Sequence, residues 1–222
     1  MMEHKNKRGV SFVRSCIRLW IVLAAVACSI NSYGQELTTP KDGDIVFHES
    51  TSRQSPVIKL AQHSRWTHCG IVFHIDGKAY VYEAVDPVKY TKLEDWIARG
   101  KKGVYRVKRL KRGELPSKSI EKMMRVGRKY KGKRYDLKFQ WSDDKMYCSE
   151  LIWKIYHHGA GIDLCPPNHF SDYSLSAPGV RRLIRKRYGS DFNPSETVVA
   201  PADLFNSKML KEVKYHLPPL QS

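Results

Sequence analysis

The pattern of hydrophobic and polar positions is clearest between residues 68 and 85. Two runs rich in β-branched and aromatic residues, 68–75 and 79–85, flank Asp76-Gly77. Asp-Gly is a preferred pair for a two-residue hairpin turn, so the pattern predicts two antiparallel strands joined at this point. Shorter apolar runs predict further strands at 45–48 and 104–110.

Apolar residues at helical spacing predict helices on both sides of this block of strands. In chain order, the predicted helices are 56–62, 93–98, a segment from Pro116-Ser117 to Gly132, a segment from about Cys148 to Gly159, and short pieces near 179–187 and 202–211. Gly159 is expected to be a C-cap. Strands in one block flanked by helices predict an α+β domain, in which an antiparallel sheet packs against helices.

The first 34 residues have the layout of a secretory signal peptide. Basic residues between positions 5 and 18 precede an apolar run at 19–27, and Ser32 and Gly34 are small residues before the expected cleavage point. The apolar run is too short to cross a bilayer, which takes about 20 residues. We therefore expect residues 1–34 to be removed and residues 35–222 to form one exported domain, periplasmic or at the cell surface.

A lipoprotein anchor is the alternative way of processing this segment. Ala25-Val26-Ala27-Cys28 is a loose match to a lipoprotein cleavage site, in which Cys28 would carry the lipid. Ala25 is a weak residue at its position in such a site, so this interpretation ranks second.

The charge of the chain points to anionic partners. The formal net charge is +17, and removing residues 1–34 takes away five basic residues and one acidic residue, which leaves +13. Such a surface attracts phospholipid headgroups, cell-wall polymers or nucleic acid. An exported protein seldom meets nucleic acid, and no nucleic-acid-binding motif is present, so nucleic acid is not an expected partner. The densest basic run, 181–187, is interpreted as a solvated helix face.

The predicted hairpin brings a histidine and a carboxylate together. If Ile75 faces Lys78 across the turn, His68 and Glu83 become diagonal neighbours on one face, roughly 7–8 Å apart at the backbone. The Glu83 carboxylate could then accept a hydrogen bond from the His68 ring, which would fix its tautomer and stabilise its charged form. The alternative is a solvent-facing pair on an edge strand.

Cys148 stands at or near the start of a predicted helix. The positive end of the helix dipole and the free backbone N–H groups there favour a thiolate and could stabilise an oxyanion. Ser142, Asp143 and Asp144 just upstream are candidate caps. The alternative is a small buried hydrophobic residue. A cysteine at a helix start, a histidine on a strand and a carboxylate beside it are the parts of a thiol acyl-transfer enzyme.

The other candidate groups predict no metal site and no cofactor. Residues 35–222 contain three cysteines, and this odd number leaves at least one free thiol. Cys69 follows His68 but points to the opposite face, which indicates core packing. Cys165 and His169 have the spacing of metal ligands but lack a second pair, so they do not predict a zinc site. Nucleotide-binding fingerprints and a Gly-x-Ser-x-Gly elbow are absent from the sequence.

Four motifs in order carry a resemblance to a known family. They are Gly43-Asp44-Ile45-Val46-Phe47, Thr67-His68-Cys69-Gly70-Ile71-Val72, Val81-Tyr82-Glu83-Ala84-Val85 and Tyr147-Cys148-Ser149-Glu150-Leu151-Ile152-Trp153. Together with the segment 135–144, they resemble the permuted papain-like amidases of the YaeF/YiiX kind. That group belongs to the NlpC-type superfamily of cell-wall hydrolases and is related to lecithin–retinol acyltransferase.

The resemblance implies a circularly permuted papain-like fold and a set of roles. The permuted group places its histidine before its cysteine, as this chain does. Cys148 would be the nucleophile, His68 the general base and Glu83 the residue that orients the histidine. Tyr147 is adjacent and is a candidate for substrate binding. Cys69 departs from the family pattern, where a small or apolar residue is expected.

Three functions are therefore expected, in this order. The first is hydrolysis of amide bonds such as those of cell-wall peptides, through a thioester on Cys148. The second is hydrolysis or transfer of lipid acyl groups, which the kinship with lecithin–retinol acyltransferase and the basic surface favour. The third is a non-catalytic basic module that binds an anionic membrane or polymer.

Overall fold

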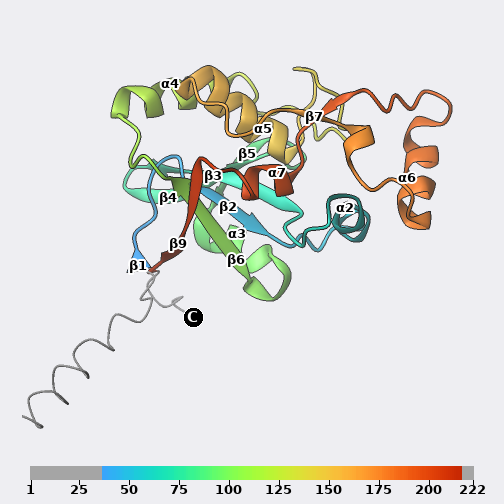
Figure 1. Ribbon diagram of the computed structural model, residues 1–222. Helices are drawn as coiled ribbons and strands as arrows, with labels where there is room; N and C mark the ends of the chain where they lie inside the picture. Colours follow the sequence, from blue (N-terminus) through green and yellow to red (C-terminus); the bar gives the residue numbers. More distant parts are fainter. Residues whose placement is uncertain (1–36, 217–222) are drawn as a thin grey trace, which may run out of the picture. The chain divides into compact units, whose positions relative to one another are not determined.

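The computed structural model describes residues 37–216, and these contain one large sheet and a small one. The large sheet has seven strands in the order β1-β9-β6-β2-β3-β4-β5 (Figure 1). Their bounds are Leu37–Thr38 (β1), Ile45–His48 (β2), His68–Ile75 (β3), Lys78–Glu83 (β4), Lys89–Lys92 (β5), Tyr105–Leu110 (β6) and Leu210–Tyr215 (β9). Only β1 runs parallel to its neighbour, β9, and the other pairs are antiparallel. The predicted α+β fold with an antiparallel sheet is confirmed.

The hairpin forms at the predicted position. Ile75 pairs with Lys78, and the two turn residues Asp76 and Gly77 have φ angles of 49° and 73°. Two positive φ angles in a row are the geometry of a type I′ turn, which matches the twist of the flanking strands. The same register continues outward from Ile71 and Tyr82, so Gly70 lies opposite Glu83.

Helices cover both faces of the sheet. Helices α4 (Ser117–Arg128), α5 (Cys148–Ile155) and α7 (Pro201–Phe205) share one core with the odd-numbered positions of β2 and β3. Helix α3 (Leu93–Arg99) packs on the other face, where Leu93 and Trp96 contact the even-numbered positions. Alternate residues of each strand therefore enter different cores, as the period of a strand requires.

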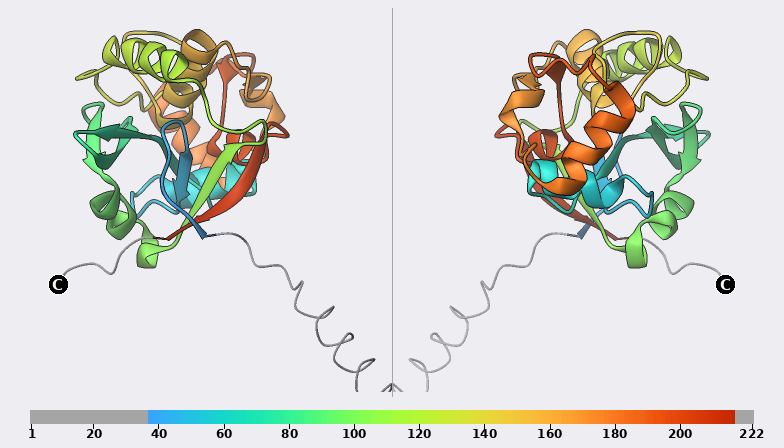
Figure 2. Two further views of the ribbon diagram at one scale, coloured as in Figure 1. Left: turned by 90° about the vertical axis from the view of Figure 1, so that its left-hand side faces the viewer. Right: turned by 90° about the vertical axis from the view of Figure 1, so that its right-hand side faces the viewer.

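Two further helices lie at one end of the sheet (Figure 1). Helix α2 (Ser55–Gln62) contacts α6 (Pro178–Tyr188), and the two lie side by side in Figure 2. The short strands β7 (Asn168–His169) and β8 (Thr197–Val198) form the second sheet. Single helical turns span Lys101–Gly103, Tyr156–Ala160 and Phe170–Asp172. Among the helices of residues 37–216, none has both the length and the apolar composition needed to cross a membrane.

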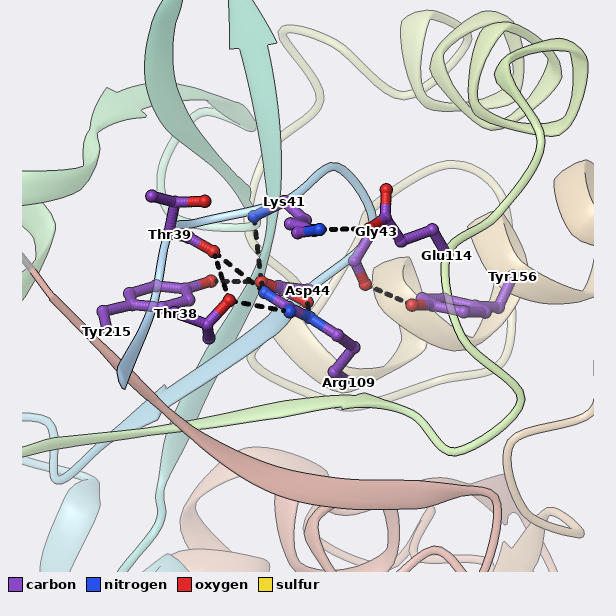
Figure 3. A network of polar contacts seen from close by, with 9 residues as sticks. All are labelled: Thr38, Thr39, Lys41, Gly43, Asp44, Arg109, Glu114, Tyr156 and Tyr215. Carbon is purple, nitrogen blue, oxygen red and sulfur yellow. Dashed lines mark hydrogen bonds and ion pairs between the residues drawn. The ribbon is translucent and has the colours of Figure 1, made fainter. Parts of the chain in front are cut away.

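A buried ion pair between Asp44, just before β2, and Arg109 links the strands β1, β9, β6 and β2 (Figure 3). Asp44 accepts two hydrogen bonds from Arg109 of β6, each at 2.7 Å, and one from the Tyr215 hydroxyl of β9 at 2.8 Å. Arg109 also donates to Thr38 and Thr39 near β1. The Tyr156 hydroxyl donates to the Gly43 carbonyl. Asp44, in the Gly43-Asp44 motif, therefore stabilises the strand order, because its buried charge is fully hydrogen-bonded.

Two secondary-structure predictions in the C-terminal half are wrong. The segment 202–211 is not one helix, because α7 ends at Phe205 and residues from Leu210 onward form β9. Gly159 is not a C-cap either. It lies inside the Tyr156–Ala160 turn, and the cap is Gly161, with φ of 67°. A Cβ on Gly159 would lie 2.6 Å from the Cα of Met123, so close packing of α4 explains this glycine.

The predicted signal segment 1–34, including the alternative lipidation site Cys28, lies outside the described residues. Residues 37–216 belong to one compact unit by their contacts.

Candidate active site

Helix α5 begins at Cys148, whose side chain is 3% exposed. Residues 142–144 were predicted to cap this helix, and that prediction is wrong. The N-cap is Tyr147, and the Glu150 carboxylate accepts a hydrogen bond from the Tyr147 backbone N–H at 3.4 Å. Asp143 instead pairs with Lys154 at 2.8 Å. The cysteine thus keeps the expected place at the positive end of a helix, although Glu150 of the first turn, and not residues 142–144, bonds to the N-cap.

His68 and Glu83 form a direct hydrogen bond. Nε2 of His68 donates to Oε2 of Glu83 at 2.6 Å, and both side chains are buried. The predicted diagonal geometry is confirmed, and a solvent-facing pair is ruled out by the burial. A hydrogen bond on Nε2 fixes the ring orientation and leaves Nδ1 as the nitrogen free to face another group.

Glu83 is held by more than the histidine. Its carboxylate accepts hydrogen bonds from Thr91 Oγ1 at 2.6 Å and Trp96 Nε1 at 2.9 Å, and it pairs with Arg99. Burial acts to raise the pKa of Glu83, but the bonds from His68 and Arg99 outweigh it and lower the pKa to about 2. Glu83 is therefore an ionised, fixed acceptor for the histidine ring.

Cys148 and His68 interact directly and shift each other's pKa. Contact with the Cys69 thiol and with His68 lowers the pKa of Cys148 well below its usual value, although burial opposes the shift. Burial also acts to lower the pKa of His68, but hydrogen bonding to Cys148 and Glu83 outweighs it and raises the pKa to about 9. Each group favours the charged form of the other, so the arrangement supports a thiolate beside an imidazolium.

Two further side chains contact the thiol. Cys69 is fully buried in the core, as predicted, but it also lies against Cys148. Burial and the neighbouring Cys148 raise the pKa of Cys69, which keeps it a protonated donor. Burial and the interaction with Cys148 likewise raise the pKa of Tyr135. One S–H donor, from Cys69, and one O–H donor, from Tyr135, therefore lie next to the Cys148 sulfur, which carries the negative charge.

Sequence reasoning assigned no role to Tyr135. Its only signal was its place in the segment 135–144 that resembles the family. A parallel bridge between Tyr135 and Met146 brings it next to the start of α5. Gln54 Nε2 donates to the Tyr135 hydroxyl at 3.4 Å. Neither contact is visible in the local pattern of the sequence.

Two cavities adjoin the Cys148–His68 pair. His68 lines a cavity of about 800 Å³ whose walls include six charged side chains, namely Asp86, Arg99, Arg134, Asp136, Lys138 and Lys145. Cys148 lines a smaller cavity of about 110 Å³ with mostly apolar walls. Thr67 and Tyr135 line both cavities. A substrate at the sulfur could therefore place a polar group in the larger cavity and an apolar group in the smaller one.

Tyr147, the candidate for substrate binding, lines the smaller cavity. Its hydroxyl accepts a hydrogen bond from the Val199 backbone N–H at 3.2 Å, and its ring packs edge-on against Phe139 at 5.3 Å. The residue is 2% exposed. Its contacts thus shape a wall of the cavity beside Cys148.

A second histidine, His48, packs against the His68 ring. His48 pairs with His68 across β2 and β3, and the ring centroids are 5.1 Å apart. His48 also stacks on Trp96 at 4.0 Å, and the Trp96 and His68 ring centroids are 6.0 Å apart. The Nδ1 atom of His48 is buried without a hydrogen-bond partner in the described part of the chain. Burial, followed by the nearby His68, lowers the pKa of His48 to about 3, so its ring stays neutral.

The fold and the site define a class of protein. An antiparallel sheet packed on a helix that begins with a buried cysteine, next to a histidine held by a carboxylate, is the arrangement of a papain-like thiol enzyme. The chain belongs to the permuted papain-like amidase family YaeF/YiiX, C92, whose profile matches residues 39–214.

Two similar proteins support this assignment. Protein YiiX of Escherichia coli (strain K12), described as uncharacterised, is 41% identical over 179 residues, which cover 81% of this chain and 88% of YiiX. A crystal structure of yiiX from Escherichia coli O157:H7, described as a metalloprotein, superimposes with a TM-score of 0.77 at 41% identity. That match covers 82% of this chain and 100% of the other. In this chain, residues 37–216 contain no group of three or more His, Cys, Asp or Glu side chains placed to hold a metal ion.

Proposed function

We propose that this protein is a thiol hydrolase of amide or related acyl bonds, with cell-wall peptides as its first substrate class. The observation that carries the proposal is the connected set Cys148, His68 and Glu83. Glu83 bonds to His68 at 2.6 Å, and His68 interacts with a cysteine whose pKa is lowered. Membership of an amidase family supports the same type of bond.

The proposed reaction uses the thiolate–imidazolium pair directly. The Cys148 sulfur attacks the carbonyl carbon, and His68 gives its proton to the leaving amine as the carbon–nitrogen bond breaks. A water molecule then attacks the thioester while His68 takes its proton, which releases the acid and restores the pair. The backbone N–H of Cys148 at the helix start and the Tyr135 hydroxyl are the proposed donors to the oxyanion.

A matched pair of variants tests this proposal. Cys148→Ala should lower the hydrolysis of amides and esters by about 10⁴-fold or more, because no nucleophile remains. Cys165→Ala is the control, since this cysteine is absent from both cavity walls and burial raises its pKa to about 12. Equal activity of wild type and Cys148→Ala on every amide and ester tried would contradict the proposal and favour a non-catalytic binding module.

Lipid acyl groups are the second candidate substrate class, and the apolar cavity favours them. Side chains of α2, α6 and the segment 198–201 line this cavity together with Cys148. Removing a methylene group from water contributes about 0.8 kcal/mol, so an acyl chain in this cavity would bind more tightly as it lengthens. Acyl transfer to an alcohol or amine instead of water would use the same thioester.

Chain length separates the two substrate classes. For a lipid acyl hydrolase, kcat/KM for acyl esters should rise by about four-fold for each added methylene until the cavity is full. Mass spectrometry of an organic extract of the purified protein should also detect lipid. If kcat/KM does not depend on chain length and no lipid is bound, lipid is not the substrate.

The proposal places the substrate outside the cytoplasm. It rests on the predicted signal peptide, with the lipoprotein anchor at Cys28 as the alternative. Mass spectrometry of the N-terminus after expression would separate cleavage behind Gly34 from lipidation of Cys28. An uncleaved chain in the cytoplasmic fraction would contradict both.

A further inference from the structure

Helix α6 has one basic side and one apolar side. Four of its basic residues are exposed, namely Arg181, Arg182, Arg185 and Lys186. Val180 is buried, and Leu183 and Ile184 are partly buried on the opposite side. Within residues 37–216, no ion pair involves any of the four exposed basic residues. Their charges are therefore free to meet an external anion.

The apolar side of α6 forms part of the cavity that contains Cys148. Val180, Leu183 and Ile184 line it from α6, and Val57 and Ile58 line it from α2. One helix thus connects the basic surface to the apolar space at the proposed nucleophile.

A fixed arginine holds α6 in this position. Arg187 donates to Gln54 Oε1 at 2.8 Å, and its guanidinium lies 5.3 Å from the centre of the Phe139 ring. Gln54 in turn donates to Tyr135, which contacts Cys148. The helix is therefore coupled to the site through side chains, as well as through the cavity wall.

We propose that α6 is a docking surface for an anionic phospholipid membrane, oriented so that the cavity at Cys148 receives an acyl chain from the bilayer. This inference rests on the lipid acyl function proposed above. The four exposed basic side chains of α6 match the headgroup region of an anionic membrane, which attracts each nearby Lys or Arg. Leu60 of α2, a helix in contact with α6, is 50% exposed and adds an apolar group at this end of the molecule.

Vesicle binding tests the inference directly. The full chain carrying Cys148→Ala, which cannot turn over lipid, is titrated with vesicles of phosphatidylcholine alone or mixed with phosphatidylglycerol. We expect binding to the mixed vesicles only, weakening steeply as salt rises. Replacing all four exposed basic residues of α6 by Gln should weaken this binding by at least about 50-fold, since each contributes roughly five-fold near an anionic surface.

A charge-matched control separates a docking surface from general basicity. Helix α4 also exposes four basic residues, Lys118, Lys122, Arg125 and Arg128, and it lies well away from α6 in Figure 1. Replacing these four by Gln removes the same charge and should weaken vesicle binding by at most a few-fold. Circular dichroism of both variants checks that they are folded.

Three results would overturn the inference. The first is equal weakening by the α4 and α6 substitutions, and the second is binding to soluble polyphosphate as tight as to vesicles. The third is no binding to anionic vesicles at low salt. A failure of the proposed lipid chemistry is distinguishable, because the wild type would then bind vesicles through α6 yet release no fatty acid from them.

Discussion

Two buried histidines lie side by side on neighbouring strands, and their surroundings leave one neutral and make the other a cation. His48 and His68 face each other across β2 and β3 and are 2% and 7% exposed. The pKa of His48 is lowered to about 3, mainly by burial, whereas bonds to Cys148 and Glu83 overcome burial and raise the pKa of His68 to about 9. The comparison shows that hydrogen-bonded charged partners, and not depth, decide which ring is a cation.

The neutral ring has a consequence for the charged one. Two adjacent imidazolium rings would repel each other, so a neutral His48 leaves the positive charge on His68 alone. The His48 ring also packs against both Trp96 and His68, with centroid distances of 4.0 and 5.1 Å. A Cβ on Gly100 would come within 2.7 Å of His48 Nδ1, so the ring has little room to move.

Among changes to the two histidines and Glu83, the largest effect is expected from removing the charged ring. His68→Ala should lower kcat/KM for an amide or acyl substrate by at least about 1,000-fold, because the thiol loses its base and the leaving group its acid. Steady-state kinetics and a thermal melt should be recorded together. Unchanged kcat/KM in a folded variant would contradict the role of His68.

A smaller but more specific effect is expected from Glu83→Gln. Glutamine keeps the shape but removes the negative charge, so the pKa of His68 should fall from about 9. Activity in wild type should decline as the pH rises through about 9, where His68 loses its proton. In Glu83→Gln the decline should move to lower pH, with kcat/KM about 10- to 100-fold lower. A pH–rate profile with the same alkaline limb in both proteins would contradict this.

The His68–Glu83 pair should also make the free energy of unfolding depend on pH. The pKa of His68 is raised from 6.5 to about 9, so its contribution is complete below pH 6.5 and is lost as the pH rises through about 9. The pKa of Glu83 is lowered from 4.5 to about 2, so its contribution is present above pH 4.5 and is lost as the pH falls through about 2. The free energy of unfolding gained from the pair should therefore be greatest between pH 4.5 and 6.5. Denaturant melts across the pH range, with Glu83→Gln as reference, measure this gain.

The smallest effect is expected from replacing the neutral ring by another neutral ring. His48→Phe retains stacking against Trp96 and does not touch the reacting atoms, so kcat/KM should fall by less than about ten-fold. The alkaline limb should stay near its wild-type pH. His48→Ala is the contrasting variant, because it leaves a hole beside His68 and should lower kcat/KM further. A large shift of the alkaline limb in His48→Phe would show that His48 carries part of the charge.

Local sequence patterns predicted the part of the site that lies on the hairpin. Asp76-Gly77 determines the turn and its register, and register alone puts His68 and Glu83 on one face. The place of Cys148 at a helix start was also visible locally, although its cap was assigned to the wrong residues.

What the sequence could not provide are contacts between distant segments. Tyr135 reaches Cys148 through a bridge to Met146, and His48 meets His68 only because β2 pairs with β3. Strand β9 was not predicted, and only its first two residues fell in the helix expected at 202–211, because its register with β6 depends on tertiary pairing. The apolar cavity combines α2, α6 and the segment 198–201, which no local pattern brings together.

The reactivity of the three cysteines tests the central claim most directly. Iodoacetamide alkylation is followed by peptide mass spectrometry between about pH 5 and 9, a range around the pKa of about 8.5 of a free thiol. Burial raises the pKa of Cys69 and Cys165, whereas that of Cys148 is lowered. We predict that Cys148 alone reacts fast below about pH 7 and loses this advantage in His68→Ala. If Cys148 reacts no faster than Cys69 and Cys165, the thiolate–imidazolium pair does not exist and the account is wrong.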